Sequence, residues 1–271
     1  MKTTTGILLG LALTLSLNQT QTHAAVYSNA ATATVTAGAI FDNDPTNGGY
    51  LNLGTVYVLS GEFKFNKGTG VGAGLINIGT AIVTGGTFTS NKTGYMNYVG
   101  STSGFINNGQ YTYNTNYGAE NYSSLTVAGG SFSFNNVGLR NETNGNVSGT
   151  ATLIGGTFSN NTAAGIYNDT KMTITFGHVN SNGQYGVLNT GTLTLVGGDF
   201  TANSYADLAN WPGATINIYA KNCSLGFGTF VGVNNGAIKS MTLTFAHGST
   251  QTLKYMNAGT INVYPLTAYN H

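Results

Sequence analysis

Residues 129–141 read GGSFSFNNVGLRN, and this stretch contains both halves of a motif that recurs along the chain. The first half is a Gly pair followed by Phe132 and, three residues after the Phe, by Asn135. The second half is Gly138, followed three residues later by Asn141. The same order of residues at a regular period indicates a repeat architecture, in which each repeat is one structural unit.

Copies of the first half run along most of the chain. They are Phe63 with Asn66, Phe88 with Asn91, Tyr111 with Asn114, Phe132 with Asn135, Phe158 with Asn161, Val179 with Asn182 and Phe200 with Asn203, preceded by the variant pair Phe41 with Asp44. Successive copies lie 22, 25, 23, 21, 26, 21 and 21 residues apart. Copies of the second half end at Asn52, Asn77, Asn97, Asn121, Asn141, Asn168, Asn189 and Asn210. Repeats this short cannot each enclose a core, so we expect them to stack.

Each repeat contains three short runs with strand character, separated by Gly or Asn. The clearest run alternates polar and apolar residues, as in 124–127 (SLTV), which is the two-residue period of a half-buried strand. Stacked coils would align like side chains in columns, with Gly at corners of positive φ and with Asn, which also tolerates that conformation, in amide ladders. The sequence therefore predicts an all-β right-handed parallel β-helix of about eight to eleven coils, with three short strands per coil. A β-barrel or β-sandwich is the alternative, and the nearly constant coil length argues against it.

The composition excludes several classes of protein. The chain has 271 residues, with 9 Lys and Arg against 8 Asp and Glu, and 40 Gly. Hydrophobic residues still make up 41% and recur at short range, which argues against a disordered Gly/Ser/Asn polymer. A net charge of +1 without a basic cluster predicts no binding to nucleic acid or to an anionic membrane surface. Cys223 is the single cysteine, so we expect a buried or half-buried thiol and no intramolecular disulfide.

The N-terminus has the features of an export signal. Lys2 precedes an apolar run from Ile7 to Leu17, and small residues stand at Ala24 and Ala25, where a signal peptidase would cut. The run is too short to span a bilayer, and no later segment is long and apolar enough to do so. We expect a cleaved signal peptide at 1–25 and one β-helix domain at 26–271, with regular coils at 39–210 and irregular coils at 211–271. The mature protein is expected to be secreted or held at a cell surface.

The repeated Gly-Gly-x-Phe-x-x-Asn pattern resembles the repeats of polymorphic outer-membrane-protein and autotransporter-type adhesin passengers, from Ala39 to about Asn210. This resemblance implies a right-handed β-helix displayed on a bacterial surface, and attachment to host or neighbouring cells. The sequence ends at 265–271 (PLTAYNH) without the β-barrel translocator of that family, and it has no cell-wall sorting motif. The implied attachment therefore requires a released chain, a partner, or a longer protein.

The acidic residues are spread along the repeats. Polysaccharide lyases and hydrolases built on β-helices need clustered carboxylates or acidic Ca²⁺ ligands. The acids are Asp42, Asp44, Glu62, Glu120, Glu142, Asp169, Asp199 and Asp207, without a paired-Asp motif, and His247 has no acidic neighbour in sequence. We therefore expect no catalytic residues, no metal and no cofactor, with a polysaccharide lyase or hydrolase as the alternative function.

Charged residues share slots in successive repeats at two places. Glu120 and Arg140 both precede the second marker Asn, and Glu142 and Asp169 both follow it. One interpretation is a small polar ligand site. The other is a surface pair of Glu120 with Arg140, worth less than about 1 kcal/mol, beside two solvated acids. His178 and Asp199 also share a slot in adjacent coils and are expected to form a hydrogen-bonded surface pair.

Polar strand positions predict two outward columns of hydroxyl groups. The columns contain Ser124, Thr126, Thr150, Thr152, Thr173, Thr192 and Thr194, with Lys171 as an interruption and with Tyr57 and Ile82 in place of Thr in earlier coils. They resemble the Thr arrays of ice-binding β-solenoids, so ice binding is a second alternative function. Thr is also a good strand former without any such role.

The two ends of the rod carry charge or irregular sequence, which protects them against strand addition. Residues 41–45 bring two acids and a Pro, and the C-terminal part brings Lys221, Lys239 and Lys254. We therefore expect a monomer that binds through a lateral face, where aromatic side chains supply most of the contact energy. The candidate binding residues are Tyr95, Tyr98, Tyr122, Tyr167 and Trp211. The expected function is an adhesin-like or structural β-helix that attaches to a cell-surface receptor or glycan.

Overall fold

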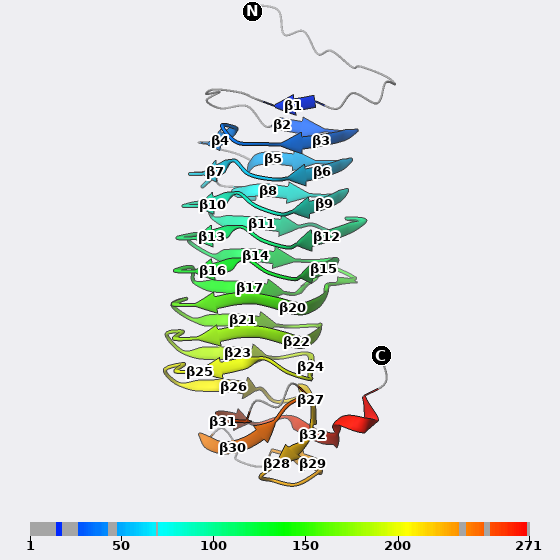
Figure 1. Cartoon of the computed structure of the whole chain (residues 1–271), viewed down its shortest axis with the longest axis vertical. Helices are drawn as coiled ribbons and strands as arrows, with labels where there is room; N and C mark the ends of the chain where they lie inside the picture. Colours follow the sequence, from blue (N-terminus) through cyan, green and yellow to red (C-terminus); the bar gives the residue numbers. More distant parts are fainter. Residues whose placement is uncertain are drawn as a thin grey trace, which may run out of the picture.

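The chain is a right-handed parallel β-helix whose coils stack along the axis of a rod (Figure 1). The computed structural model describes residues 15–17, 27–42, 48–68, 70–232, 237–246 and 250–269. Of the expected signal peptide, only β1 (Leu15–Leu17) lies among these residues, where it pairs in parallel with β3. Among the described residues, no helix has the length and apolar character needed to cross a membrane.

Three parallel ladders, here called sheets 1, 2 and 3, form the sides of the rod. Sheet 1 contains β3 (Thr32–Val35), β6 (Thr55–Val58), β9 (Thr80–Val83), β12 (Ser103–Ile106), β15 (Ser124–Val127), β20 (Thr150–Ser159), β22 (Lys171–Asn180), β24 (Thr192–Leu195), β27 (Thr215–Ala220) and β32 (Thr260–Pro265). Sheet 2 contains β4 (Ile40–Asp42), β7 (Glu62–Lys64), β10 (Thr87–Thr89), β13 (Gln110–Thr112), β16 (Ser131–Ser133), the second halves of β20 and β22, and β25 (Asp199–Thr201).

Sheet 3 is the third side of the rod. It contains β2 (Tyr27–Asn29), β5 (Gly48–Asn52), β8 (Ala73–Asn77), β11 (Thr93–Asn97), β14 (Tyr117–Asn121), β17 (Val137–Asn141), β21 (Ala164–Asn168), β23 (Tyr185–Asn189), β26 (Ala206–Asn210) and β31 (Thr250–Asn257). The regular coils run from β5 to β26, and in each of them the chain passes from sheet 3 to sheet 1, then to sheet 2 and back to sheet 3.

The first markers form a stacked aromatic column inside sheet 2, as predicted. Strand pairing places Phe63, Phe88, Tyr111, Phe132, Phe158, Val179 and Phe200 in register. Neighbouring rings from Phe63 to Phe158 lie 4.4 to 4.7 Å apart and are nearly parallel. Sheet 1 adds the inward column predicted from its alternation, including Leu125 and Val127, and these side chains are buried. The core is therefore a set of continuous columns rather than a separate cluster in each coil.

Two ladders of buried Asn side chains join the coils at the corners. In the first, each Asn Nδ2 donates to Oδ1 of the next marker Asn at 2.9 to 3.2 Å, in the order Asn66, Asn91, Asn114, Asn135, Asn161, Asn182 and Asn203. In the second ladder, the same side-chain bond joins each marker Asn to the next at 2.6 to 2.9 Å, in the order Asn52, Asn77, Asn97, Asn121, Asn141, Asn168, Asn189, Asn210 and Asn257. These amides are 0 to 2% exposed. Their mutual bonds supply the partners that buried polar groups require.

The first ladder also binds the backbone of neighbouring coils. Asn91 Nδ2 donates to the Phe63 carbonyl oxygen at 2.9 Å, and its backbone N–H donates to Asn114 Oδ1 at 3.0 Å. Asn114 repeats both contacts one coil later, with the Phe88 carbonyl oxygen and with Asn135 Oδ1, each at 3.0 Å. The first-half Asn markers are therefore buried structural residues that hold each coil to the coils on both sides, as their repetition predicted.

The corner geometry corrects one expectation. Gly130 and the other second glycines of the pairs have positive φ, as predicted, but the marker Asn residues, Asn91 and Asn114 among them, do not. The residue before each first-half Asn takes the left-handed conformation instead, with φ between 55° and 59°, at Phe65, Ser90, Tyr113, Phe134, Asn160, Ser181 and Ala202. In the second half of the motif, Gly is needed for close approach between coils, because a Cβ at Gly138 would lie 2.5 Å from the Gly165 carbonyl oxygen.

The C-terminal end departs from the parallel pattern. Three antiparallel pairings close it, β30 (Lys239–Thr244) with β31, β28 (Asn222–Cys223) with β30, and β29 (Gly228–Val231) with β32, before the short helix η1 (Leu266–Ala268). Asp207 Oδ1 accepts a hydrogen bond from Asn203 Nδ2 at 2.9 Å, and the first Asn ladder ends at this contact. Cys223 is a buried free thiol, and burial raises its pKa. At the other end, Phe41 joins the aromatic column, while Asp44 and Pro45 lie outside the described residues.

Candidate functional site

The outer side of sheet 3 and its corner with sheet 1 carry two columns of side chains in which residue type changes from coil to coil. The pre-Asn column, one residue before each second marker, contains Leu51, Ile76, Met96, Glu120, Arg140, Tyr167, Leu188 and Ala209. The post-Asn column, one residue after it, contains Leu53, Ile78, Tyr98, Tyr122, Glu142, Asp169, Thr190 and Trp211. Both columns are apolar or aromatic at their ends and charged in the middle.

Four of the five predicted binding residues lie on these columns. Tyr98, Tyr122 and Trp211 belong to the post-Asn column, and Tyr167 belongs to the pre-Asn column. Tyr95 is a wrong prediction, because its side chain is 0% exposed inside the rod and bonds to the Asn97 Oδ1 at 3.3 Å. Strand alternation explains the error, since Tyr95 is two residues before its marker Asn, on the inward side of β11.

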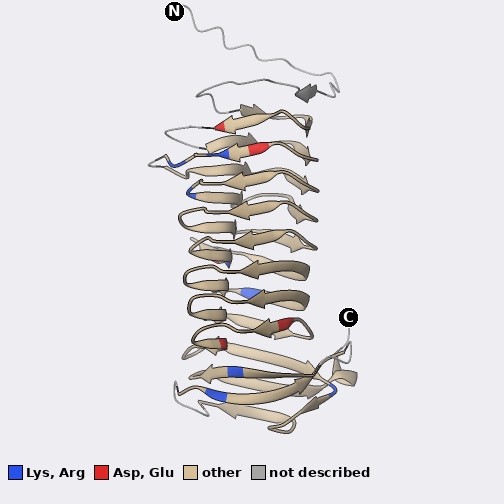
Figure 2. Cartoon of the chain, turned by 60° about the vertical axis from the view of Figure 1, so that its left-hand side comes forward, with Lys and Arg blue, Asp and Glu red and all other residues tan. Residues whose placement is uncertain are grey.

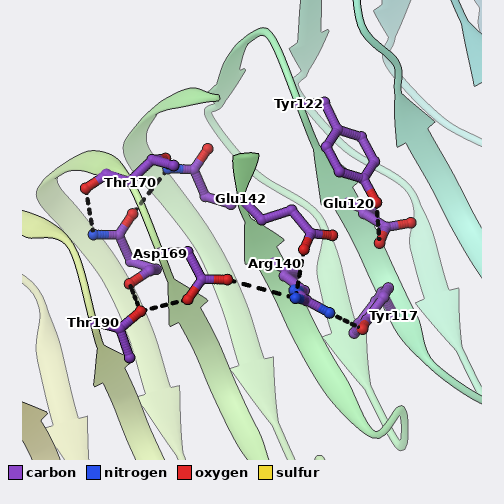
Figure 3. Close-up of polar contacts among 10 residues, drawn as sticks. Tyr117, Glu120, Tyr122, Arg140, Glu142, Asp169, Thr170 and Thr190 are labelled. Carbon is purple, nitrogen blue, oxygen red and sulfur yellow. Dashed lines mark hydrogen bonds and ion pairs between the residues drawn. The ribbon is translucent and has the colours of Figure 1, made fainter. Parts of the chain in front are cut away.

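The middle of the two columns forms the Arg140 cluster, which we define as Tyr117, Glu120, Tyr122, Arg140, Glu142, Tyr167 and Asp169. Figure 3 labels these residues except Tyr167. Arg140 forms ion pairs with Glu142 and, at 3.5 Å, with Asp169. Its guanidinium also donates to the Tyr117 hydroxyl and lies 5.2 and 5.4 Å from the ring centres of Tyr117 and Tyr167. Thr190 donates to Asp169, so that carboxylate is oriented from both sides.

Glu120 lies deeper than Glu142, the other buried acid of the cluster. It is 5% exposed, and burial, followed by the neighbouring Glu142 carboxyl group, raises the pKa of Glu120 to about 8. The Tyr122 hydroxyl donates to Glu120 Oε1 at 2.9 Å, and burial raises the pKa of Tyr122 as well. At neutral pH, Glu120 is therefore mostly a neutral carboxylic acid that can donate a proton in a hydrogen bond, beside an acid that accepts one.

These contacts correct the interpretation of a solvated surface pair. Glu120 and Arg140 do share a slot, as predicted, but Arg140 binds the two acids of the next column, and Glu120 is buried. Glu120, Glu142 and Asp169 lie about one repeat apart in the sequence, and the coil period brings each to about one strand spacing from the next. The signal that could have revealed this was present in the shared slots. The alternation of polar and apolar residues is unclear beside a corner, so it did not show which of these side chains are buried.

Two insertions lie on either side of the Tyr122 corner. From Asn121, the last residue of β14, the next strand of sheet 1 begins three positions later, at Ser124. The same step takes six positions from Asn97 to Ser103 and nine from Asn141 to Thr150. The longest insertion includes a hairpin of β18 (Thr143–Asn144) and β19 (Val147–Ser148), which begins directly after Glu142. The Ser123 hydroxyl donates to the Ser101 carbonyl at 3.0 Å and ties the shorter insertion to this corner. The insertions thus occur where the repeat also departs from its usual residues.

Apolar groups cover the outer side of sheet 3 next to the cluster. Ala73, Ile76 and Met96 are buried there, separate from the main core, and Leu51, Val71, Ile78, Tyr98 and Tyr122 pack against them. The Tyr98 and Tyr122 rings meet edge to face at 6.0 Å. The sequence left open whether the pre-Asn column was an exposed patch or a second core column. Ile76 and Met96 form a small second core, whereas Leu51, Tyr167 and Leu188 are half-buried.

Other candidate residues lie elsewhere on the rod. His178 Nδ1 lies 3.3 Å from Asp199 Oδ2 on the exposed side of sheet 2, which confirms the surface pair. His247 lies outside the described residues. In the view of Figure 2, charged residues along the described coils are few. In the described part of the chain, no group of three or more His, Cys, Asp or Glu side chains is arranged to hold a metal ion.

The hydroxyl columns on sheet 1 extend beyond the coils that the sequence indicated. Register places Thr32, Thr55, Thr80, Ser103, Ser124, Thr150, Lys171, Thr192, Thr215 and Thr260 in one outward column. The neighbouring column includes Thr126, Thr152, Thr173 and Thr194, but Tyr57, Ile82 and Phe105 occupy its earlier coils. The strands of sheet 1 therefore pair without a break, whereas Lys171 interrupts the first column of hydroxyl groups and Tyr57, Ile82 and Phe105 replace Thr in the second.

Comparison with known proteins gives no match. No family model, no curated protein and no solved structure matches this chain. The geometry of the columns is therefore the basis for a functional assignment.

Proposed function

We propose that this protein is an extracellular adhesin-like β-helix that binds a glycan along the outer side of sheet 3, centred on the Arg140 cluster. The observation that carries the proposal is the grouping of Glu120, Arg140, Glu142 and Asp169 between aromatic side chains on one lateral face. An attachment role agrees with the resemblance of the repeats to adhesin passengers and with the export signal at residues 1–25. The rod would act as a monomer.

The chemistry of the cluster suits sugar hydroxyl groups. A hydroxyl group both donates and accepts, and the cluster offers a donor at the Arg140 guanidinium next to a carboxylate acceptor at Asp169, both about a quarter exposed. Tyr122, Tyr167 and Trp211 offer ring faces or edges, and Trp211 is 45% exposed. Apolar surfaces with a few oriented polar groups are typical of ligand sites. One coil step of about 4.8 Å is also comparable with the length of a pyranose ring, so successive coils can contact successive sugars.

The charges favour neutral or amino sugars over acidic ones. Arg140 is the cation of the cluster, and two carboxylates already share it. An added carboxylate on the ligand would face like charges at close range, which disfavours binding. The proposed ligand is therefore a neutral or amino-sugar polysaccharide of a cell surface.

A glycan array and a cell-attachment assay test the proposal. We expect Tyr167→Ala with Trp211→Ala to lower binding at least tenfold, because two exposed ring contacts are lost while the Asn ladders remain intact. Tyr57→Ala is the matched control, since Tyr57 is a partly exposed aromatic residue on sheet 1. Circular dichroism should show all variants folded. Undiminished binding by the double variant, or an equal loss in the control, would contradict a site on sheet 3.

The second candidate is a polysaccharide hydrolase at the same site, favoured by one observation. A carboxylic acid held neutral near a second carboxylate is the arrangement used for general acid catalysis of glycosidic cleavage. The array distinguishes the candidates when each captured glycan is released and sized by chromatography. Intact glycan agrees with binding, whereas shortened glycan that depends on Glu120 establishes hydrolysis.

A further inference from the structure

A second surface, at the corner between sheets 2 and 3, carries aromatic side chains in a strained backbone conformation. Phe65, Tyr113 and Phe134 have φ of 59°, 56° and 58°, and their side chains are 48%, 60% and 48% exposed. Bulky residues rarely adopt positive φ, but the corner takes this conformation in the other coils too, at Ser90, Asn160, Ser181 and Ala202. Exposing the same rings to water brings no folding stability in return. The three exposed rings therefore make this column a candidate binding surface, independent of the Arg140 cluster on the opposite edge of sheet 3.

The column has a gap the size of one ring. Strand pairing aligns Lys64 with Thr89, Thr112 and Ser133, so the next residues Phe65, Ser90, Tyr113 and Phe134 follow one another at one coil step each. Tyr113 and Phe134 stack with their ring centres 5.0 Å apart and their planes 7° apart. Ser90 has no ring, so Phe65 and Tyr113 are separated by two steps of about 4.8 Å.

The core of the same three coils shows what fits such a gap. Two residues earlier in each coil, Phe88 lies between Phe63 and Tyr111, with ring centres 4.4 and 4.7 Å away and planes tilted by 9° and 7°. A planar aromatic ring placed over Ser90 would lie one coil step from Phe65 and one from Tyr113, as Phe88 does from Phe63 and Tyr111. Parallel, offset rings at this separation attract one another beyond the area that they bury.

We infer that the Ser90 position is a binding slot for one aromatic side chain, Tyr or Trp, of a partner polypeptide. The ring completes the outer stack of Phe65, Tyr113 and Phe134. Ser90 is half-buried and carries no ring, so its own side chain does not fill the ring position between its neighbours. The contact is weak on its own and suits a partner that engages several points along the rod.

The test uses N-acetyl-tryptophanamide as the probe and saturation-transfer NMR as the readout. Ser90→Tyr fills the slot with a side chain that Tyr113 shows to be compatible with the corner, and should weaken probe binding at least fivefold without lowering the melting temperature. Ser181→Tyr is the matched control, because Ser181 has φ of 55° in the same column but lies between Asn160 and Ala202. It should leave binding unchanged. Tyr113→Ala should weaken binding because one wall is lost.

Three results would overturn the inference. They are equal probe binding by the wild type and Ser90→Tyr, equal loss in Ser181→Tyr, and preferential binding of methyl β-glucoside over the aromatic probe. The last result would assign the corner to sugars instead. Because the Arg140 cluster is untouched in these variants, glycan binding there is measured separately and should not change.

Discussion

The Asn ladders and the Arg140 cluster both place polar side chains under the surface of the same coils, and they do so in different ways. Asn161 is 0% exposed and bonds to Asn135, Asn182 and the Phe132 carbonyl, and the same neutral contacts recur in coil after coil. Glu120 is 5% exposed, occurs once, and changes charge near neutral pH. The repeated polar groups stabilise the stack, whereas the single acid costs stability when it ionises. Departures from the repeat therefore mark the place to look for function.

The largest expected effect tests the regular stack. Phe132→Ala should lower the free energy of unfolding by about 3 to 5 kcal/mol, because it opens a cavity between Tyr111 and Phe158 in the core column. Phe134→Ala, two residues away in the same coil, should change stability by less than about 1 kcal/mol, since that ring is half exposed. Urea denaturation measures both. Similar losses of stability in the two variants would contradict the difference in burial between the Phe132 and Phe134 rings.

The second effect concerns Glu120 and pH. A folded-state pKa of about 8, against 4.5 for the free side chain, means that folding favours the protonated acid. Its contribution is fully present below pH 4.5, decreases as the pH rises toward 8, and is lost above it. Between pH 4.5 and 8.5 the wild type should therefore lose about 2 to 4 kcal/mol more stability than Glu120→Gln, whose amide remains neutral. Parallel pH profiles for the two proteins would contradict a buried neutral acid.

A third effect returns to the stack. Asn161→Ala should lower the free energy of unfolding by about 2 to 3 kcal/mol, because the backbone amide and Nδ2 of Asn135 lose their acceptor. Asn136→Ala is the control, as Asn136 is exposed and its side chain bonds to the Thr162 hydroxyl at the surface. Thermal unfolding followed by circular dichroism compares them. A loss in the control equal to that in Asn161→Ala would mean that burial of the ladder does not set its contribution.

Most of the fold could be predicted from the sequence because the repeat encodes it twice. The spacing of Phe132 and Asn135 and of Gly138 and Asn141 determines the coil, and stacking then places every copy in register. The conformation of the corner was missed because Phe, Tyr, Ser, Asn and Ala all occupy the left-handed position, so no residue type identified it. The antiparallel C-terminal strands lack a repeat from which register could be inferred.

The candidate site was predicted only in outline. Shared slots placed Glu120 with Arg140 and Glu142 with Asp169, which the register confirms. The ion pairs join Arg140 of the pre-Asn column to Glu142 and Asp169 of the post-Asn column. Comparing residues at one position of successive repeats shows only neighbours within one column, so it could not predict these pairs. Tyr95 shows the same limit, since an aromatic residue near a corner faces inward or outward according to a single residue of register.

The smallest effect tests whether Arg140 serves the fold or the site. Arg140→Met keeps the length and apolar character of the side chain but removes both ion pairs and the bond to Tyr117. The pairs are partly exposed, so the loss of stability should be about 1 to 2 kcal/mol, between the values for surface and buried pairs. Without the cation, Glu142 and Asp169 repel each other, and the pKa of Glu120 should rise further above its usual range, because Arg140 lowers it in the wild type. Titration of the Glu120 carboxyl carbon by NMR measures that shift, and an unchanged midpoint would mean that Arg140 does not affect the pKa of Glu120.

Added salt should narrow the stability difference between Arg140→Met and the wild type. Screening weakens the attraction of Arg140 for the acids in the wild type and the repulsion between Glu142 and Asp169 in the variant. If salt leaves the difference unchanged, Arg140 contributes through packing against Tyr117 and Tyr167 rather than through charge.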